Sequence, residues 1–293
     1  MTVSRLLAPG LAVLVLGLAS GCAQGGGPTA REVWRLAGAG LATPESVLWD
    51  PESDVYLVSN IVGSPSAEDG EAFIARVSPE GRVIELKWID SHRDGIELDA
   101  PKGMALVGQT LWVADIHNLR RFDRGSGESR GSIPIEGSAF LNDLCPDGEG
   151  GVYVSDSGTH RVHRVSANGA VTLVVDDERL AQPNGLLLTA EGLLVLSFGG
   201  REVFRITDGG LQPWARLPAA GLDGVVSIDD GTLIISSWKG RALYHLDTEA
   251  HSRILVDGLV APADIGWDGS RRRLLVPLFK DDAVAVWELA DPR

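Results

Sequence analysis

The chain contains six copies of one sequence unit, and this repetition constrains the fold more than any other feature. Each copy places a polar residue at the start of an apolar run, followed by a tight turn and a second apolar run. These polar residues occupy what we call the leading positions, which are Glu45, Lys102, Asn142, Asn184, Asp223 and Asp264. Successive leading positions lie 57, 40, 42, 39 and 41 residues apart. A period near 40 residues indicates a repeat architecture instead of two independent domains.

The turns and apolar runs of each unit predict an all-β fold. Glycine-containing turns such as residues 147–151 and 228–231 separate the apolar runs, as in β-hairpins. Third apolar segments, such as residues 202–207, alternate as strands with one packed face do. No segment has a convincing helical period. Four strands in each of six units predict a six-bladed β-propeller, with a long loop at residues 60–71 of the first unit.

The two ends of the repeat region predict how the ring closes. The last unit ends after the segment "AVAVWELADPR" with only three strands, which would leave an unpaired edge. The segment "REVWRLAG", residues 31–38, is a free strand-like segment before the first unit. We predict that it forms the outer strand of the sixth blade, so that residues 32–293 make one closed propeller.

The first residues have the pattern of a targeting segment, which lies outside the fold. Arg5 precedes an apolar run, and small residues stand directly before Cys22. This ending resembles the lipobox of bacterial lipoproteins, with residues 1–21 as signal peptide and residues 22–31 as lipidated cysteine and flexible tether. A plain secretory signal is the alternative. The resemblance, with Ala23 after the cysteine, implies an exported lipoprotein that Cys22 anchors to the outer membrane, facing the periplasm.

Charge and cysteine content exclude some classes of function. Acidic residues outnumber Lys and Arg by 40 to 26, which gives a formal net charge of −14 and argues against nucleic-acid binding. Beyond the targeting segment, no apolar stretch is long enough to cross a bilayer.

With Cys22 lipidated, Cys145 has no disulfide partner, and we expect it to be a small buried thiol. We expect a monomer.

Propeller geometry brings the leading positions together. The first strand of each blade lines the central channel, so the six leading residues should converge at one mouth. The second strand runs back to the same mouth. We therefore expect its last residues there as well, namely Ser59, Asp115, Asp156, Ser197, Ser237 and Leu278.

Carboxylates gathered in this way need a compensating charge. Oxygen ligands from Glu, Asp and Asn suit Ca²⁺ or another hard divalent cation. We predict Glu45, Asn184 and Asp223 as ligands, with Asn142 close by. Two alternatives stay open: the ammonium of Lys102 could neutralise the acids, and Asn184-Gly185 and Asp223-Gly224 could be simple turn dipeptides.

The segments "PES…WDP", "LND…PDG", "PNG" and "LDG", in this order and at blade spacing, resemble the SMP-30/gluconolactonase family over residues 32–289. The resemblance implies a divalent cation, often calcium, on Glu45, Asn184 and Asp223. It implies that Asn142 contacts the metal or the substrate. It also implies hydrolysis of lactones or related esters, with Asp223 as the catalytic base.

Some residues depart from the family pattern. Phe140 stands where sugar lactonases commonly carry an Arg, so a bidentate donor for a polar substrate is missing. Phe198, Trp238 and Phe279 are expected on the same face. These departures favour an apolar or aromatic ester or lactone at least as much as a sugar lactone. The expected substrate contacts are Lys102, Phe140, Asp264, Phe198 and Trp238.

Proton transfer has more than one candidate. A cation-bound Asp223 would be a weak base, so Asp264 or Asp156 could accept the proton of water instead. His117, in a loop near the mouth, could be a proton shuttle or a surface residue. The Gly127–Gly131 match to G-x-S-x-G precedes no helix, so we interpret it as a chance match.

Other propellers offer alternative functions. The segments "WVADIHNLRRF" and "YVSDSGTHRVHRV" resemble NHL-type repeats, which would make the chain a non-catalytic propeller that binds a ligand or protein. A propeller like strictosidine synthase would need a glutamate base that cannot be placed in this sequence.

Overall fold

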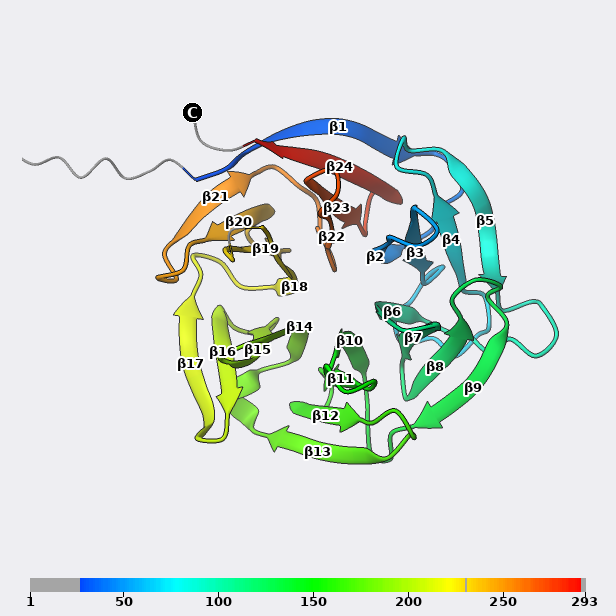
Figure 1. The fold of residues 1–293 in the computed structure, drawn as a ribbon, viewed down its shortest axis with the longest axis horizontal. Helices are drawn as coiled ribbons and strands as arrows, with labels where there is room; N and C mark the ends of the chain where they lie inside the picture. The colour runs from blue at the N-terminus through cyan, green and yellow to red at the C-terminus, as the bar shows by residue number, and fades with distance from the viewer. Residues whose placement is uncertain (1–26, 230, 291–293) are drawn as a thin grey trace, which may run out of the picture.

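The structure is a computed structural model that describes residues 27–229 and 231–290. It consists of six four-stranded antiparallel sheets arranged as blades around a central channel (Figure 1). The predicted all-β, six-bladed propeller is therefore confirmed. Within the described ranges the only helix is a single 3₁₀ turn, η1 (Glu178–Leu180). The same residues include no helix with the length and apolar character of a membrane span.

The first three blades each contain four strands that follow one another along the chain. Blade 1 contains β2 (Pro44–Asp50), β3 (Val55–Asn60), β4 (Phe73–Val77) and β5 (Val83–Asp90). Blade 2 contains β6 (Pro101–Val107), β7 (Thr110–Asp115), β8 (Asn118–Asp123) and β9 (Ser129–Pro134). Blade 3 contains β10 (Leu141–Pro146), β11 (Val152–Asp156), β12 (Arg161–Val165) and β13 (Val171–Asp176). The loop between β3 and β4 is long, as expected.

The next two blades repeat this order, and the sixth departs from it. Blade 4 contains β14 (Pro183–Thr189), β15 (Gly192–Ser197), β16 (Glu202–Thr207) and β17 (Gly210–Arg216). Blade 5 contains β18 (Leu222–Ser227), β19 (Leu233–Ser237), β20 (Ala242–Leu246) and β21 (Ser252–Val256). Blade 6 contains β22 (Gly266–Asp268), β23 (Arg273–Leu278), β24 (Ala283–Ala290) and β1 (Thr29–Ala37).

The N-terminal strand closes the ring, as predicted. β1 pairs antiparallel with β24, from Thr29 opposite Ala290 to Ala37 opposite Ala283. β1 begins at Thr29, so residues 29–31, which we had assigned to the tether, belong to the strand. The targeting segment and Cys22 lie outside the described residues.

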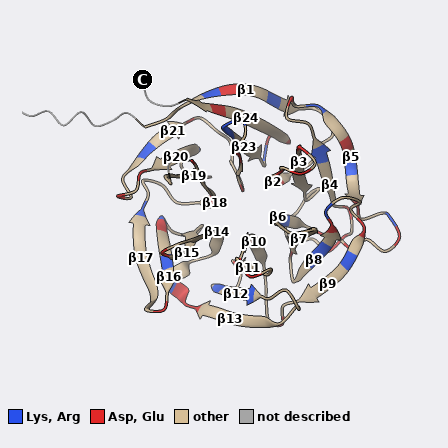
Figure 2. Cartoon of the chain, viewed as in Figure 1, with Lys and Arg blue, Asp and Glu red and all other residues tan. Residues whose placement is uncertain are grey.

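Apolar side chains pack between neighbouring blades. Six clusters of buried residues fill the six interfaces between blades, for example Leu243 of blade 5 against Val276 of blade 6. All side chains of β3 are buried, because both faces of this middle strand meet a neighbouring sheet. The outer strands β1 and β5 instead carry charges of both signs (Figure 2). Burial of apolar area between blades therefore holds the ring together.

A β-bulge at the start of the first strand sets the direction of five of the six leading side chains. In five blades the pairing with the second strand shifts across the leading residue, for example between Pro183 and Leu186. Such a bulge gives one strand extra residues and re-aims their side chains. The sixth blade differs, because β22 begins only at Gly266 and Asp264 precedes it.

The glycines after three leading residues permit close packing of the inner strands. A Cβ on Gly185 would lie 2.1 Å from the carbonyl oxygen of Asp223, and one on Gly224 would lie 2.3 Å from the amide nitrogen of Ile265. Neither glycine has a positive φ angle. The interpretation of Asn184-Gly185 and Asp223-Gly224 as left-handed turn dipeptides is therefore wrong, since the glycines make room for the neighbouring backbone.

Candidate active site at the channel mouth

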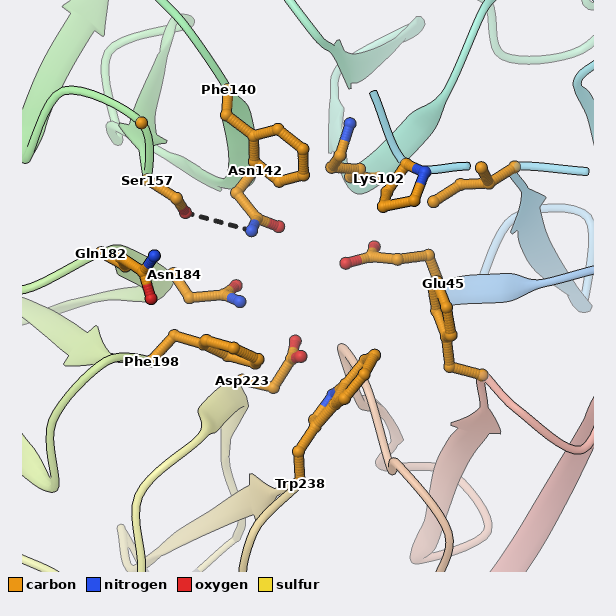
Figure 3. A pocket seen from close by; sticks show the side chains of 14 residues that line it. Glu45, Lys102, Phe140, Asn142, Ser157, Gln182, Asn184, Phe198, Asp223 and Trp238 are labelled. Atoms are coloured by element: carbon orange, nitrogen blue, oxygen red, sulfur yellow. Dashed lines mark hydrogen bonds between the residues drawn. The ribbon is translucent and has the colours of Figure 1, made fainter. Parts of the chain in front are cut away.

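A cavity of about 450 Å³ opens at the mouth where the first strands begin (Figure 3). Five of the six leading residues line it, each from a different blade: Glu45, Lys102, Asn142, Asn184 and Asp223. All five are at least 93% buried. Propeller geometry thus brings together residues that are far apart in the sequence.

Four of these side chains present an oxygen without a hydrogen-bond partner. The unpaired atoms are Glu45 Oε2, Asn142 Oδ1, Asn184 Oδ1 and Asp223 Oδ1. The four side chains point toward one another across the open centre of the cavity (Figure 3). Asn142 is oriented by its amide nitrogen, which donates to Ser157 Oγ at 3.1 Å. Because buried acceptors are normally satisfied, four convergent unpaired oxygens indicate the position of a ligand.

The donor set fits a hard divalent cation. Two carboxylates and two amide oxygens are ligands that Ca²⁺ accepts, with waters to complete its coordination. In the part of the chain that the structure describes, no cluster of three or more His, Cys, Asp or Glu forms a metal site. All four donor atoms at the mouth are oxygens, so the residues present favour Ca²⁺ over metals that prefer nitrogen or sulfur.

The charged form of the two carboxylates of this set is unfavourable in the absence of a cation. Burial raises the pKa of Glu45 well above its usual value, and Asp223 and Asp264 raise it further. Burial likewise raises the pKa of Asp223, together with the charges of Asp264 and Asp143, while the indole of Trp238 lowers it in part. A bound cation would favour both charged forms.

Lys102 does not fill the centre of the cavity. Its Nζ donates to the carbonyl oxygen of Ala100 at 2.9 Å and lies 4.3 Å from the centre of the Phe140 ring. Figure 3 shows its side chain directed away from Glu45. Burial lowers the pKa of Lys102 to about 8, against the opposing influence of Glu45 and Asp115. Its ammonium therefore makes no ion pair with Glu45 or Asp223.

Two further carboxylates support the site without lining the cavity. Asp264 accepts a hydrogen bond from Ser46 Oγ at 2.5 Å, and burial raises its pKa to about 7 against this bond. Asp143 accepts hydrogen bonds from the backbone N–H groups of Leu144 and Leu186, each at 2.7 Å. Burial raises the pKa of Asp143, and the charge of Asp264 raises it further. Leu186 ends the bulge that presents Asn184, so Asp143 holds that bulge in place. Sequence reasoning missed Asp143, although an acid directly after a leading residue is unique among the six units.

The ends of the second strands serve the scaffold. Asp115 accepts a hydrogen bond from the N–H of Ala100 at 2.7 Å and another from Nε of Arg120 at 2.7 Å. Asp156 accepts the N–H of Phe140 at 2.8 Å, and also binds Ala139, Gly158 and Thr159. With four donors on its carboxylate and no place in the cavity lining, Asp156 is not available as a base.

One of these positions was misassigned. Asn60, and not Ser59, pairs with Pro44 and so occupies the last position of the second strand in blade 1. Ser59 Oγ instead accepts the N–H of Ser46 at 2.9 Å, within the bulge that presents Glu45. The shift arises because β3 is one residue longer at its end than the turn pattern suggested.

Apolar side chains line the same cavity as the oxygens. Ile61, Phe198, Trp238 and Phe279 each follow the last residue of a second strand and line the cavity. We call these four residues the collar. Phe140 and Trp238 line the cavity as expected, whereas sequence reasoning missed Ile61, Pro65, Ser157 and Gln182. The signal that could have found Ile61 and Ser157 is their shared position one residue beyond a second strand.

The remaining candidates lie outside the cavity lining. His117 Nδ1 lies 3.0 Å from the carbonyl oxygen of Ser138, and its Nε2 lies 3.5 Å from Glu68. Cys145 is free and buried, as expected for a core thiol, and burial raises its pKa. Gly127 lies in a turn that leads into the outer strand β9, so no nucleophile elbow forms.

Comparisons with known proteins identify the fold. No protein-family model matches the chain, and no curated protein matches it. Among solved structures, a gluconolactonase from Xanthomonas campestris superposes with a TM-score of 0.68 at 17% identity, covering 91% of this chain and 96% of that one. A streptogramin B lyase has a TM-score of 0.65 at 9% identity, covering 90% and 98%. A catalytically inactive virginiamycin B lyase from Staphylococcus aureus, with quinupristin, has a TM-score of 0.62 at 14% identity, covering 90% and 100%.

At these identities the likeness shows a shared fold. The presence of a gluconolactonase among the similar structures agrees with the resemblance stated from the sequence. The lyases show that propellers of this shape also occur in proteins with another activity.

Proposed function

We propose that the protein is a calcium-dependent hydrolase of lactones or related esters, with its active site at the channel mouth. One observation carries this proposal: four buried oxygens from four blades converge without hydrogen-bond partners. Glu45, Asn142, Asn184 and Asp223 would hold the cation. When bound there, Ca²⁺ would polarise the substrate carbonyl and stabilise the negative charge that develops on its oxygen.

Asp223 is the proposed base. Its Oδ1 faces the centre of the cavity without a hydrogen-bond partner, and a bound cation would keep the carboxylate in the charged form that can accept a proton. It would take a proton from the attacking water as the new carbon–oxygen bond forms. The ring carbon–oxygen bond then breaks, and the same proton passes to the leaving alkoxide. Asn142, held by Ser157, keeps its oxygen directed at the reacting region.

The membrane anchor at Cys22 remains a proposal, and the topology adds an orientation to it. Second strands end at the mouth, so the third strand β24 runs from the mouth to the far face, and its partner β1 begins at that far face. Thr29 therefore lies opposite the cavity. An anchor a few residues before Thr29 would leave the cavity open to the aqueous side, away from the membrane.

The test measures hydrolysis of lactones and aryl esters by the chain without residues 1–22, with Ca²⁺ or with a chelator. We expect turnover that depends on Ca²⁺, and a loss of about 10²–10⁴-fold in kcat/KM for Asp223→Asn. Asp147→Asn is the matched control, because Asp147 is buried at the opposite end of its blade, and it should leave kcat/KM unchanged.

Product analysis separates the alternatives. Hydrolysis in isotopically labelled water places one water oxygen in the product carboxylate, whereas elimination, the class of reaction that lyases catalyse, places none. Binding of Ca²⁺ without turnover of any lactone or ester would instead favour the non-catalytic binding propeller.

A further inference from the structure

We propose that the substrate carries a large apolar group, such as an alkyl chain or an aryl ring, next to its reacting carbonyl. This proposal rests on the proposed function and specifies the substrate class of the same site. It follows from the division of the cavity into two parts. The four unpaired oxygens form what we call the polar floor, and the collar is the apolar part.

The four collar residues occupy the same position in their repeat units. The residue after each second strand is Ile61, Ile116, Ser157, Phe198, Trp238 or Phe279, in blade order. Five of these six residues are apolar. Ile61, Phe198, Trp238 and Phe279 line the cavity, and Ile116 belongs to the same buried cluster as Ile61, with Phe279 packed against it. The apolar character is therefore a property of one position in the repeat.

The aromatic members of the collar form a continuous wall. Phe198 meets Trp238 edge-on with ring centres 5.6 Å apart, and Trp238 lies 5.0 Å from Phe279 in a tilted arrangement. These contacts join blades 4, 5 and 6 and hold the rings in fixed positions. The wall continues to Ile61 and Pro65 of blade 1, on the side of Glu45.

The polar floor lies on the channel side of this wall. Leading residues lie inside the bulge at the start of the first strand, whereas collar residues lie one position beyond the end of the second strand. A ligand whose carbonyl reaches the four oxygens must therefore pass its remaining atoms between the collar side chains. The cavity of about 450 Å³ also has more room than a simple lactone ring needs.

The collar offers little to a polyol. Sugar hydroxyl groups buried against Ile61, Phe198 and Phe279 would lose their hydrogen bonds to water without replacement. Phe140 adds another apolar face, and the Lys102 ammonium uses one of its three donors on the carbonyl of Ala100. Ser157, the one polar residue of the ring, is engaged with Asn142 and with the carbonyl oxygen of Pro183. Apart from the four oxygens, the polar groups of the lining are few, chiefly Gln182, Lys102 and Nε1 of Trp238, so the site favours an alkyl or aryl lactone over a sugar lactone.

The experiment compares kcat/KM for γ-lactones of increasing alkyl chain length with kcat/KM for glucono-δ-lactone, in the presence of Ca²⁺. We expect kcat/KM to rise about fourfold for each added methylene until the collar is covered. Phe279→Ser should flatten this dependence, whereas Phe279→Leu should preserve most of it. Phe198→Ser is the second variant, and it serves if Phe279→Ser fails to fold.

The outcomes separate this proposal from the proposed function. A flat dependence on chain length, or a preference for glucono-δ-lactone, overturns the apolar substrate class and leaves the hydrolase standing. If no lactone is turned over, the proposed function fails. Non-hydrolysable alkyl lactams are then added to the protein while the fluorescence emission of Trp238 is measured. Trp238→Phe is the control for the origin of the signal. Affinity that increases with chain length supports an apolar ligand, and affinity independent of chain length overturns it.

Discussion

Glu45 and Asp50 belong to the two ends of β2, and both residues are buried. At the far end, Asp50 accepts a hydrogen bond from Nε of Arg124 at 3.0 Å and another from the N–H of Glu52 at 2.9 Å. Burial raises the pKa of Asp50, but these donors outweigh burial and lower it below its usual value. At the mouth, Glu45 Oε2 has no partner, and burial raises the pKa of Glu45 well above its usual value.

The same contrast recurs in blades 3 and 6. Asp147, at the far end, accepts hydrogen bonds from the N–H groups of Glu149 and Gly151 and from Nε of Arg164, each at 2.8 Å. These hydrogen bonds outweigh the effect of burial and lower the pKa of Asp147. Asp268 is held by Tyr56, Ser270 and Arg271, and its pKa is also lowered against burial. In the same blades, burial raises the pKa of Asp143 and Asp264 near the mouth.

The difference supports the proposal that the functional site lies at the mouth. At the far end, the chain supplies cations and N–H groups that lower the pKa of its buried carboxylates, although Asp50 Oδ2 itself has no hydrogen-bond partner. At the mouth, the chain leaves carboxylates and amides incomplete, which costs stability unless a ligand completes them. Such a cost at one end only is typical of a binding or catalytic site.

The largest expected effect is stabilisation by Ca²⁺. A ligand that binds only the folded state at 100 times its Kd stabilises it by about 2.7 kcal/mol, or roughly 5–10 °C in Tm for a chain of this size. Thermal unfolding of the chain without residues 1–22 measures this shift. It should disappear in Asp223→Asn and persist in Asp147→Asn. An equal shift in both variants would place the cation away from the mouth.

The next effect concerns pH in the absence of Ca²⁺. The pKa of Asp264 rises from 3.8 in the unfolded chain to about 7 in the folded protein. The folded state thus keeps this proton to higher pH, so its stabilising contribution is full below pH 3.8 and is lost as the pH rises through 7. We expect the free energy of unfolding to fall by roughly 2 kcal/mol between pH 5 and pH 7.

Denaturant titrations across this pH range, with a chelator present, check the sign. Asp264→Asn should remove the Asp264 part of the decline. The lowered pKa values of Asp50, Asp147 and Asp268 act only below about pH 3.8, outside this window. A stability that rises between pH 5 and pH 7 would contradict the assignment of the mouth as the incomplete end.

Much of the architecture could be predicted from the sequence, because it depends on properties that recur. The 40-residue period predicts the blades, and the missing fourth strand of the last unit predicts the role of β1. The leading positions could be assigned because a polar residue before a buried strand is conspicuous. Residues 102, 142, 184 and 223 therefore came together with Glu45 at one cavity, as propeller geometry requires.

The rest depends on register and contacts that no periodic pattern contains. Whether Ser59 or Asn60 ends its strand is a difference of one residue, and it decides which side chain reaches the loop backbone. Asp143 is inside a bulge, where neighbouring residues can both point inward, so alternation does not predict its direction. Lys102 turns toward Ala100 and Phe140 because those groups lie beside it in space, although its position in the repeat suggested the cavity centre.

The smallest expected effect is the most direct test of the two ends. In the metal-free protein at pH 7, Asp147→Asn should lower the free energy of unfolding by about 1 kcal/mol. It removes the charge that pairs with the partly exposed Arg164 but keeps an oxygen for the turn N–H groups. Asp223→Asn should leave stability unchanged or raise it, because it replaces a buried carboxylate of raised pKa with a neutral group of equal shape.

Equilibrium unfolding in urea measures both variants, and circular dichroism checks that each keeps the native fold. Since both substitutions are the same chemical change at buried positions, side-chain volume and type do not contribute to the difference between them. Opposite signs would therefore report only the surroundings of each carboxylate. Equal destabilisation would mean that Asp223 already has a stabilising partner within the chain, and the mouth would then need no cation.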